Sequence, residues 1–246
     1  MGGNMPVLDA SFDYDSIKEG YYDLVYQRRK GIQSKWHHLR LARIRREMGD
    51  YRDHLDVGCG PGTLIGTLPQ DRRSVGVDIA SSQIRYANEK YGTQNHQFQV
   101  LEPAKPLPFA DNSFDVVTIL EVVEHLTNET NLIVLKEINR VLRPGGYLLL
   151  TTPNRWFLCR FVEWLRDQIA DVSYEEQHIT YYKREGLEVL LKDARFVNPL
   201  ISTYQFLAPF LSFINWGLSD AVEKIEPKFL APRYGILFLA KAYKKQ

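Results

Sequence analysis

Residues 54–64 read HLDVGCGPGTL, and this stretch decides the fold. The apolar run 54–57 predicts a short buried strand that carries Asp56 near its carboxyl end. Glycines then follow at alternate positions: Gly58, Gly60 and Gly62. A second strand, SVGVD, ends at Asp78, 22 residues after Asp56. Because glycine permits positive φ and close backbone approach, the loop can wrap a ligand, and the stretch predicts a nucleoside site on a Rossmann-like sheet.

The residues around the loop indicate the chemistry of that ligand. A helix expected to begin near Gly62 would aim unpaired N–H groups at a carboxylate or phosphate. Asp78, at the end of the next strand, can accept hydrogen bonds from ribose hydroxyls. The dinucleotide fingerprint G-x-G-x-x-G fails because Thr63 replaces its last glycine, and Asp56 would repel a pyrophosphate. A ligand with a ribose, an ammonium and a carboxylate fits, and S-adenosylmethionine (SAM) has all three.

The acid followed by G-x-G-x-G resembles the first motif of the class I SAM-dependent methyltransferases. The later series LPF, D-x-S-FD, EVVEHL and LRPGGYLLLTTPN extends the resemblance over residues 53–154. It is similar to the methyltransferases that modify small molecules, such as those of ubiquinone biosynthesis. The resemblance implies an α/β fold, Rossmann-like and doubly wound, with a seven-stranded, mostly parallel sheet, an antiparallel last strand and N-terminal helices.

The resemblance also implies which residues hold the cofactor. Asp56 and the glycines after it would hold the methionine part, Asp78 the ribose, and Ile79 would flank the adenine. Glu102 is the nominee for the adenine amino group, although the family has Asp-Ala where this chain has LEP. Cys59 fits the loop as a small side chain, with a nucleophile as the other reading. The cofactor-binding residues expected are Asp56, Gly58, Cys59, Gly60, Asp78, Ile79, Glu102 and Glu121.

Helical periodicity predicts two helices within residues 16–48, separated at Gly31, with Ser34 as the cap of the second. In similar methyltransferases such helices close over SAM, so Tyr21 or Tyr22 is expected to reach the cofactor. Basic residues are frequent in the second helix, and they form either a solvated face or a patch for an anionic substrate or lipid. These residues are Lys35, Arg40, Arg43, Arg45 and Arg46.

The sequence divides into an N-terminal helical cap, residues 1–50, and a methyltransferase domain, residues 51–246. The last two strands are expected over 194–204 and 234–243, and Pro199 predicts a bulge or a sheet edge. Within the domain, two apolar insertions lie at 155–180 and 206–232.

The insertions suggest the acceptor. The first insertion carries a helical stripe with Trp and Phe, which either packs on the core or touches a membrane. The second is too short to span a bilayer and predicts a lid or a substrate wall. Both insertions indicate a large apolar or lipid-linked acceptor and allow peripheral membrane contact.

A cluster of titratable residues follows the strand expected over 114–120. Glu121, Glu124 and His125 stand at i, i+3 and i+4, which predicts one shared helical face, and His178 is expected at the same rim. The predicted catalytic residues are His178, Glu121 and His125. In one reading His178 acts as a general base without the help of a metal ion. Alternatively the cluster binds a divalent cation, as E-x-x-E-H with a distal His resembles the metal site of small-RNA 2′-O-methyltransferases. In a third reading Glu124 is merely solvated and His125 bonds to backbone.

Composition bounds the remaining possibilities. A net charge of +1 does not indicate a polyanion-binding protein, and no nucleic-acid partner is expected. Two cysteines are too few for a disulfide framework, no secretory signal is visible, and a cytoplasmic location is expected. The N/D-P-P-Y/F run of nucleobase amino methyltransferases is absent from the strand end at Glu121. The predicted function is methyl transfer from SAM, to oxygen first, on a small, lipid-like or glycan acceptor. The alternative is a non-catalytic SAM-binding or partner-binding protein.

Overall fold

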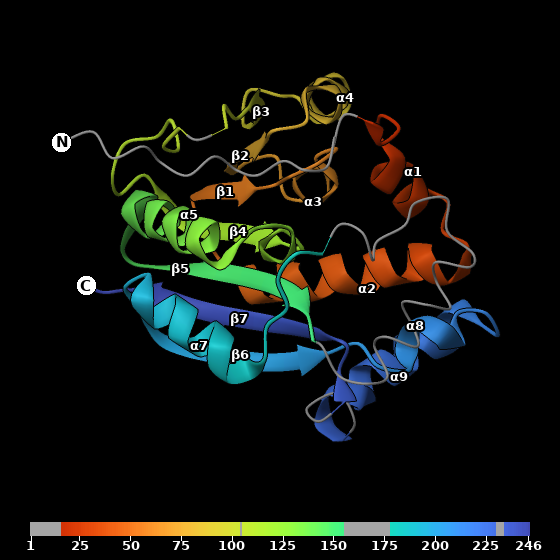
Figure 1. The fold of residues 1–246 in the computed structure, drawn as a ribbon. Helices are drawn as coiled ribbons and strands as arrows, with labels where there is room; N and C mark the ends of the chain where they lie inside the picture. The colour runs from red at the N-terminus through yellow and green to blue at the C-terminus, as the bar shows by residue number, and fades with distance from the viewer. Residues whose placement is uncertain (1–15, 104, 155–177, 230–233) are drawn as a thin grey trace.

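The structure is a computed structural model that describes residues 16–103, 105–154, 178–229 and 234–246. A seven-stranded sheet runs through it in the order β3-β2-β1-β4-β5-β7-β6 (Figure 1). The strands are β1 (Asp53–Val57), β2 (Arg73–Asp78), β3 (His96–Val100), β4 (Phe114–Leu120), β5 (Leu142–Pro153), β6 (Phe196–Tyr204) and β7 (Leu237–Lys244). Strands β1 to β5 pair in parallel, and β7 runs antiparallel between β5 and β6. The predicted fold class is confirmed.

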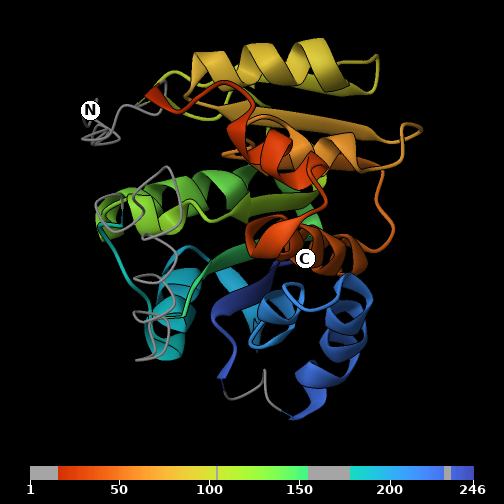
Figure 2. The same cartoon turned by 90° about the vertical axis from the view of Figure 1, so that its right-hand side faces the viewer.

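Helices cover both faces of the sheet. They are α1 (Tyr21–Gln27), α2 (Gly31–Met48), α3 (Thr63–Gly66), α4 (Ser81–Tyr91), the 3-10 turn η2 (Val123–His125), α5 (Asn128–Val141), α7 (Arg184–Asp193), α8 (Ala208–Leu211) and α9 (Trp216–Phe229). One apolar core joins the sheet to α2, α3 and α4, and a second joins the opposite face to α5 and α7. Seen toward the carboxyl ends of the parallel strands, α1 and α2 lie above α8 and α9 (Figure 2).

The two N-terminal helices form where the periodicity predicts them, but the expected cap is wrong. Helix α2 begins at Gly31 itself, so Ser34 lies inside its first turns. There the Ser34 hydroxyl donates to the carbonyl of Tyr26 at 3.2 Å, which ties α2 back to α1. The hydroxyl therefore joins two helices and does not cap one.

The strands agree with the sequence except at the start of β5. The sequence predicts that this strand begins near Tyr147, whereas β5 begins at Leu142, which pairs with Phe114. A register shift between Phe114 and Val116 accommodates the intervening residues. Strand β6 lies at the sheet edge, and its register shifts between Val197 and Leu200, so the bulge predicted at Pro199 is confirmed.

The two apolar insertions differ in what the structure describes. The helical stripe predicted in the first insertion, over 155–171, lies outside the described residues. In the second insertion, the described residues 206–229 include α8 and α9. The buried carboxylate of Glu226 in α9 accepts hydrogen bonds from the backbone N–H groups of Leu207 at 3.2 Å and Ala208 at 2.8 Å. This carboxylate holds α8 against α9. Among the described helices, none is both long and apolar enough to cross a bilayer.

The middle of β5 should control global stability. Leu148 is fully buried between the sheet and its helices, so Leu148→Ala is expected to lower the free energy of unfolding by about 3 kcal/mol. The control is Val189→Ala on α7, where the side chain is 57% exposed, with an expected change within about 0.5 kcal/mol. Urea unfolding followed by circular dichroism measures both. Equal losses in the two variants would contradict this view of the core.

Candidate active site

A cavity of about 790 Å³ lies beyond the carboxyl ends of β1, β2 and β4. Its wall includes every residue that the sequence analysis nominated for cofactor binding or catalysis. These are Asp56, Gly58, Cys59, Gly60, Asp78, Ile79, Glu102, Glu121, His125 and His178. Tyr22 also lines the cavity, whereas Tyr21 is not among its lining residues. The structure thus brings the nominated residues to one place, and the role of each stays a prediction.

The glycine loop owes its shape to backbone geometry. The N–H groups of Gly58 and Cys59 both donate to the carbonyl of Val77, at 2.8 and 3.1 Å, which turns the chain at the end of β1. Gly58 has φ +74°, and a Cβ there would lie 2.4 Å from a methyl carbon of Val122. Any larger residue at Gly58 would therefore be strained and would collide with the cavity wall. The helix after the loop, α3, begins directly after Gly62, as predicted, and is a single turn.

Asp78 connects the loop to the end of β2. One carboxylate oxygen accepts a hydrogen bond from the N–H of Gly60 at 2.7 Å, and the other accepts from the N–H of Ala80 at 2.9 Å. The backbone therefore fixes the orientation of this side chain at the end of β2.

Asp56 is the most deeply buried acid of the loop region, at 3% exposed. Burial raises the pKa of Asp56 to about 7, with a smaller contribution from the nearby charge of Asp78. The hydroxyl of Thr118 on β4 donates to the Asp56 carboxylate at 2.6 Å, which works against this rise in pKa. A cationic ligand would favour the ionised carboxylate in the same way.

A buried histidine orients the Thr118 hydroxyl. His54 Nε2 lies 2.8 Å from Thr118 Oγ1, and burial lowers the pKa of His54 to about 3, so its ring is neutral. Because the hydroxyl has one hydrogen, its donation to Asp56 leaves Oγ1 to accept from the Nε2–H tautomer of His54. Sequence reasoning missed both residues. The available signal was a polar side chain within each of two strands expected to be buried, but only the register Asp56↔Thr118, which places both on one face near Asp56, shows that they meet.

Arg40 on α2 places a cation on the cavity wall. Its side chain donates to Nδ1 of the buried His37 at 3.2 Å, whose pKa burial and the Arg40 charge hold well below the usual value. The Nε of Arg40 is buried and has no hydrogen-bond partner. The Arg40 charge also acts to lower the pKa of Asp56 and of Glu124. The sequence placed Arg40 in a basic patch without distinguishing it from its neighbours.

The expected helical face of Glu121, Glu124 and His125 is wrong. Glu121 follows β4 with φ +56°, and only a three-residue 3-10 turn comes after it, so the three side chains share no helix. Glu124 points inward, is 1% exposed and accepts a hydrogen bond from the Thr152 hydroxyl at 3.0 Å. The reading of Glu124 as a solvated side chain is therefore also wrong.

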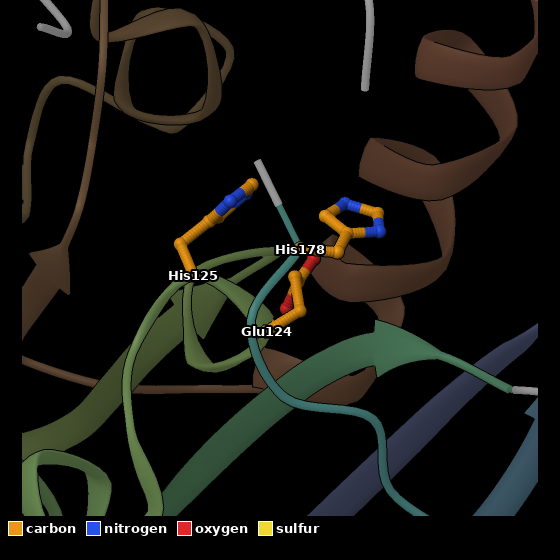
Figure 3. Close-up of side chains that lie close together, drawn as sticks. All are labelled: Glu124, His125 and His178. Atoms are coloured by element: carbon orange, nitrogen blue, oxygen red, sulfur yellow. The ribbon is translucent and has the colours of Figure 1, made fainter. Parts of the chain in front are cut away.

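The structure gathers Glu124, His125 and His178 into one cluster (Figure 3). One oxygen or ring nitrogen from each residue lies within 4.8 Å of the others. The backbone explains the meeting, because the carbonyl of Glu124 accepts from the N–H groups of Ile179 and Thr180 at 2.8 and 2.9 Å. Burial, and then the charge of Glu121, raises the pKa of Glu124 well above its usual value. The cluster thus places a buried carboxyl with a raised pKa beside two imidazoles.

Cys59 and Glu102, two of the residues predicted to bind the cofactor, differ in their surroundings. Burial raises the pKa of the Cys59 thiol well above its usual value, and its sulfur lies 3.6 Å from the Gly60 carbonyl, so this thiol is neutral and a poor nucleophile. Glu102 is exposed on the cavity wall and forms an ion pair with Lys105.

The chain is similar in sequence to known methyltransferases. Residues 55–150 match the family described as "Methyltransferase domain". A demethylmenaquinone methyltransferase of Symbiobacterium thermophilum is 30% identical over 156 residues, which cover 61% of this chain and 60% of that protein. A probable SAM-dependent methyltransferase of Mycolicibacterium smegmatis is 36% identical over 107 residues, which cover 42% of this chain and 39% of that protein. The chain therefore spans 60% or less of the length of these two relatives.

Solved structures share the fold over almost the whole chain. A SAM-dependent methyltransferase of Thermotoga maritima, described as a possible histamine N-methyltransferase, has a TM-score of 0.65 at 17% identity, covering 94% of this chain and 98% of that chain. One from Archaeoglobus fulgidus has a TM-score of 0.61 at 20% identity, covering 94% and 100%. The match over residues 55–150 and the shared fold support the predicted resemblance to the class I SAM-dependent methyltransferases, whose cofactor is SAM.

Proposed function

We propose that this chain transfers a methyl group from SAM to a small, apolar, quinone-like acceptor. The observation that carries the proposal is one cavity, which combines Asp56 and Asp78 with apolar side chains from α2, the second insertion and the residue just before β7. Those apolar residues are Trp36, Phe210, Phe213 and Ile236. The relatives named demethylmenaquinone methyltransferases support an acceptor of this kind. The oxygen acceptor predicted from sequence gains no support from those names, and neither does a glycan.

The cavity residues fit the charged groups of SAM. Asp56 would accept the ammonium group, and Asp78 the ribose hydroxyls. The carboxylate of SAM is attached to the same carbon as the ammonium, so its partner should lie near Asp56. Arg40 meets this requirement, because its charge acts on Asp56 and its buried Nε–H lacks an acceptor. An acid and a guanidinium on the wall of one cavity would recognise the amino-acid end of the cofactor.

SAM supplies a methyl group bound to a positively charged sulfur, ready for in-line displacement. The chain must then hold the acceptor in line and accept any proton that the acceptor loses. His178 is the nominee for the base, since its neighbours Ile179 and Thr180 are bonded to the Glu124 carbonyl, and Thr180 Oγ1 also donates to Leu126 at 2.6 Å. His125, with a ring centroid 5.1 Å from that of His178, could share the proton.

Cofactor affinity is expected to depend on pH through Asp56. Below its pKa of about 7 the carboxyl carries a proton and cannot pair with an ammonium, so SAM affinity should fall about tenfold for each pH unit below this value. Thr118→Val removes a hydrogen bond that lowers this pKa, and should move the midpoint to higher pH. Thr118→Ser should restore it. Calorimetry across this range measures the effect, and a pH-independent affinity would contradict it.

Arg40 should select the carboxylate of SAM. Arg40→Gln is expected to weaken SAM binding by about 10- to 100-fold, the contribution of a hydrogen bond to a charged group, and to affect decarboxylated SAM far less. Arg46→Gln is the matched control, because Arg46 pairs with Glu223 at 2.9 Å and is not among the cavity residues. Equal losses for both ligands would show that Arg40 does not contact the carboxylate.

The activity itself is tested with purified full-length protein, methyl-labelled SAM and demethylmenaquinone in detergent. We expect labelled product, with kcat lowered about 10²- to 10⁴-fold in His178→Ala and SAM affinity retained, because only the proton acceptor is lost. Turnover should be insensitive to EDTA. NMR of the product distinguishes methylation at carbon, oxygen and nitrogen.

The negative outcomes of this assay are equally specific. SAM binding without turnover of any quinone or quinol would overturn the proposal and favour the non-catalytic reading. Loss of activity in EDTA, restored by a divalent cation, would instead assign Glu124, His125 and His178 to a metal.

A further inference from the structure

The segment between α8 and α9 exposes large apolar side chains at its tip. Phe213 is 84% exposed and Ile214 is 74% exposed, so neither side chain is buried against the rest of the chain. Residues 207–218 contain no charged residue. Phe213 also belongs to the wall of the cavity, so this tip stands at the cavity mouth.

Cations flank the tip. Arg28, Arg29 and Lys30 form the turn between α1 and α2, and all three are exposed. Arg28 and Lys30 line the same cavity as Phe213, so the turn and the tip border one opening. Figure 2 shows the start of α2 above α8 at this end of the molecule.

A second, smaller cavity lies between α2 and α9 in the same region. It measures about 280 Å³, and its wall contains the cations Arg29, Lys35 and Arg45 together with the single acid Asp220. Lys35 is 1% exposed, with its Nζ 2.6 Å from the Asp220 carboxylate and 4.5 Å from the centroid of the Trp216 ring. Three cations against one acid leave this cavity positive, and its size suits a phosphate group.

We propose that the docking surface, defined as Phe213, Ile214, Arg28, Arg29 and Lys30, binds an anionic lipid bilayer, with the smaller cavity receiving a lipid phosphate. Apolar side chains flanked by cations enter the boundary between headgroups and acyl chains, and each cation adds attraction to an anionic surface. Charge complementarity therefore selects an anionic membrane over a neutral one. One consequence rests on the proposed function: a lipid-like quinone acceptor would reach the cavity directly from the bilayer.

The test is flotation of the full-length protein with vesicles that contain neither SAM nor acceptor, so failure of the proposed activity cannot affect it. Vesicles of phosphatidylcholine with about 30% phosphatidylglycerol should carry the protein, and pure phosphatidylcholine should carry much less. Ile214→Ser should weaken binding roughly tenfold, since it removes the insertion of an exposed apolar side chain. Arg28→Gln with Lys30→Gln should weaken it about fivefold per charge. The control is Val189→Ser on α7, which replaces another exposed apolar side chain, 57% exposed, away from the docking surface. This variant should bind vesicles like the parent chain.

Each other result overturns the proposal. Absence of binding to anionic vesicles would show that the protein does not bind an anionic bilayer. Binding that survives Ile214→Ser and the double glutamine variant assigns attachment to another part of the chain. Equal binding to neutral and anionic vesicles would show that Arg28, Arg29 and Lys30 do not contribute to membrane binding. A parent dimer that Ile214→Ser converts to a monomer in size-exclusion chromatography would show that a second copy of the chain covers the surface.

Discussion

The burial of the Asp56 carboxyl at the end of β1 is the constraint on which the site depends. The carboxyl is nearly inaccessible to solvent and touches the hydroxyl of Thr118 on the neighbouring strand, which is in turn 2.8 Å from the neutral ring of His54. A buried carboxylate without a positive partner is costly, so its pKa of about 7 leaves it poised between its two forms. A cation entering the cavity would favour the ionised form, so under the proposed function this desolvated acid contributes to the selection of a cationic ligand.

The sheet places the other groups around this acid. Because β1, β2 and β4 are parallel neighbours, Asp56, Asp78 and Glu121 follow or end adjacent strands at one edge. The turn at Gly58 then lies close enough to Val122 that a single added methyl group would not fit. The cofactor side of the cavity is therefore made by strand order and by close backbone approach, both of which are rigid.

This explains which features could be predicted from the sequence. The glycine loop, Asp56, Asp78 and the strand order depend on local patterns and on the chain order of the strands, and the sequence shows both. Thr118 could not be predicted, because its contact with Asp56 depends on the register between β1 and β4. The inward direction of Glu124 depends on the positive φ of Glu121, which is rare for a residue other than glycine.

Helix α2 lies between the part of the cavity proposed to bind the cofactor and the part proposed to bind the acceptor. Arg40 faces the cavity, whereas Lys35, five residues earlier and therefore on another face of the helix, pairs with Asp220 of α9. Gln205, just before the second insertion, also donates to the Trp36 carbonyl at 3.0 Å. The insertion is thus attached to one face of α2, while another face presents Arg40 to the cavity. Under the proposed function, substitutions in α8 and α9 would reshape the wall that contacts the acceptor without moving Arg40, so acceptor choice and cofactor binding could vary separately on one scaffold.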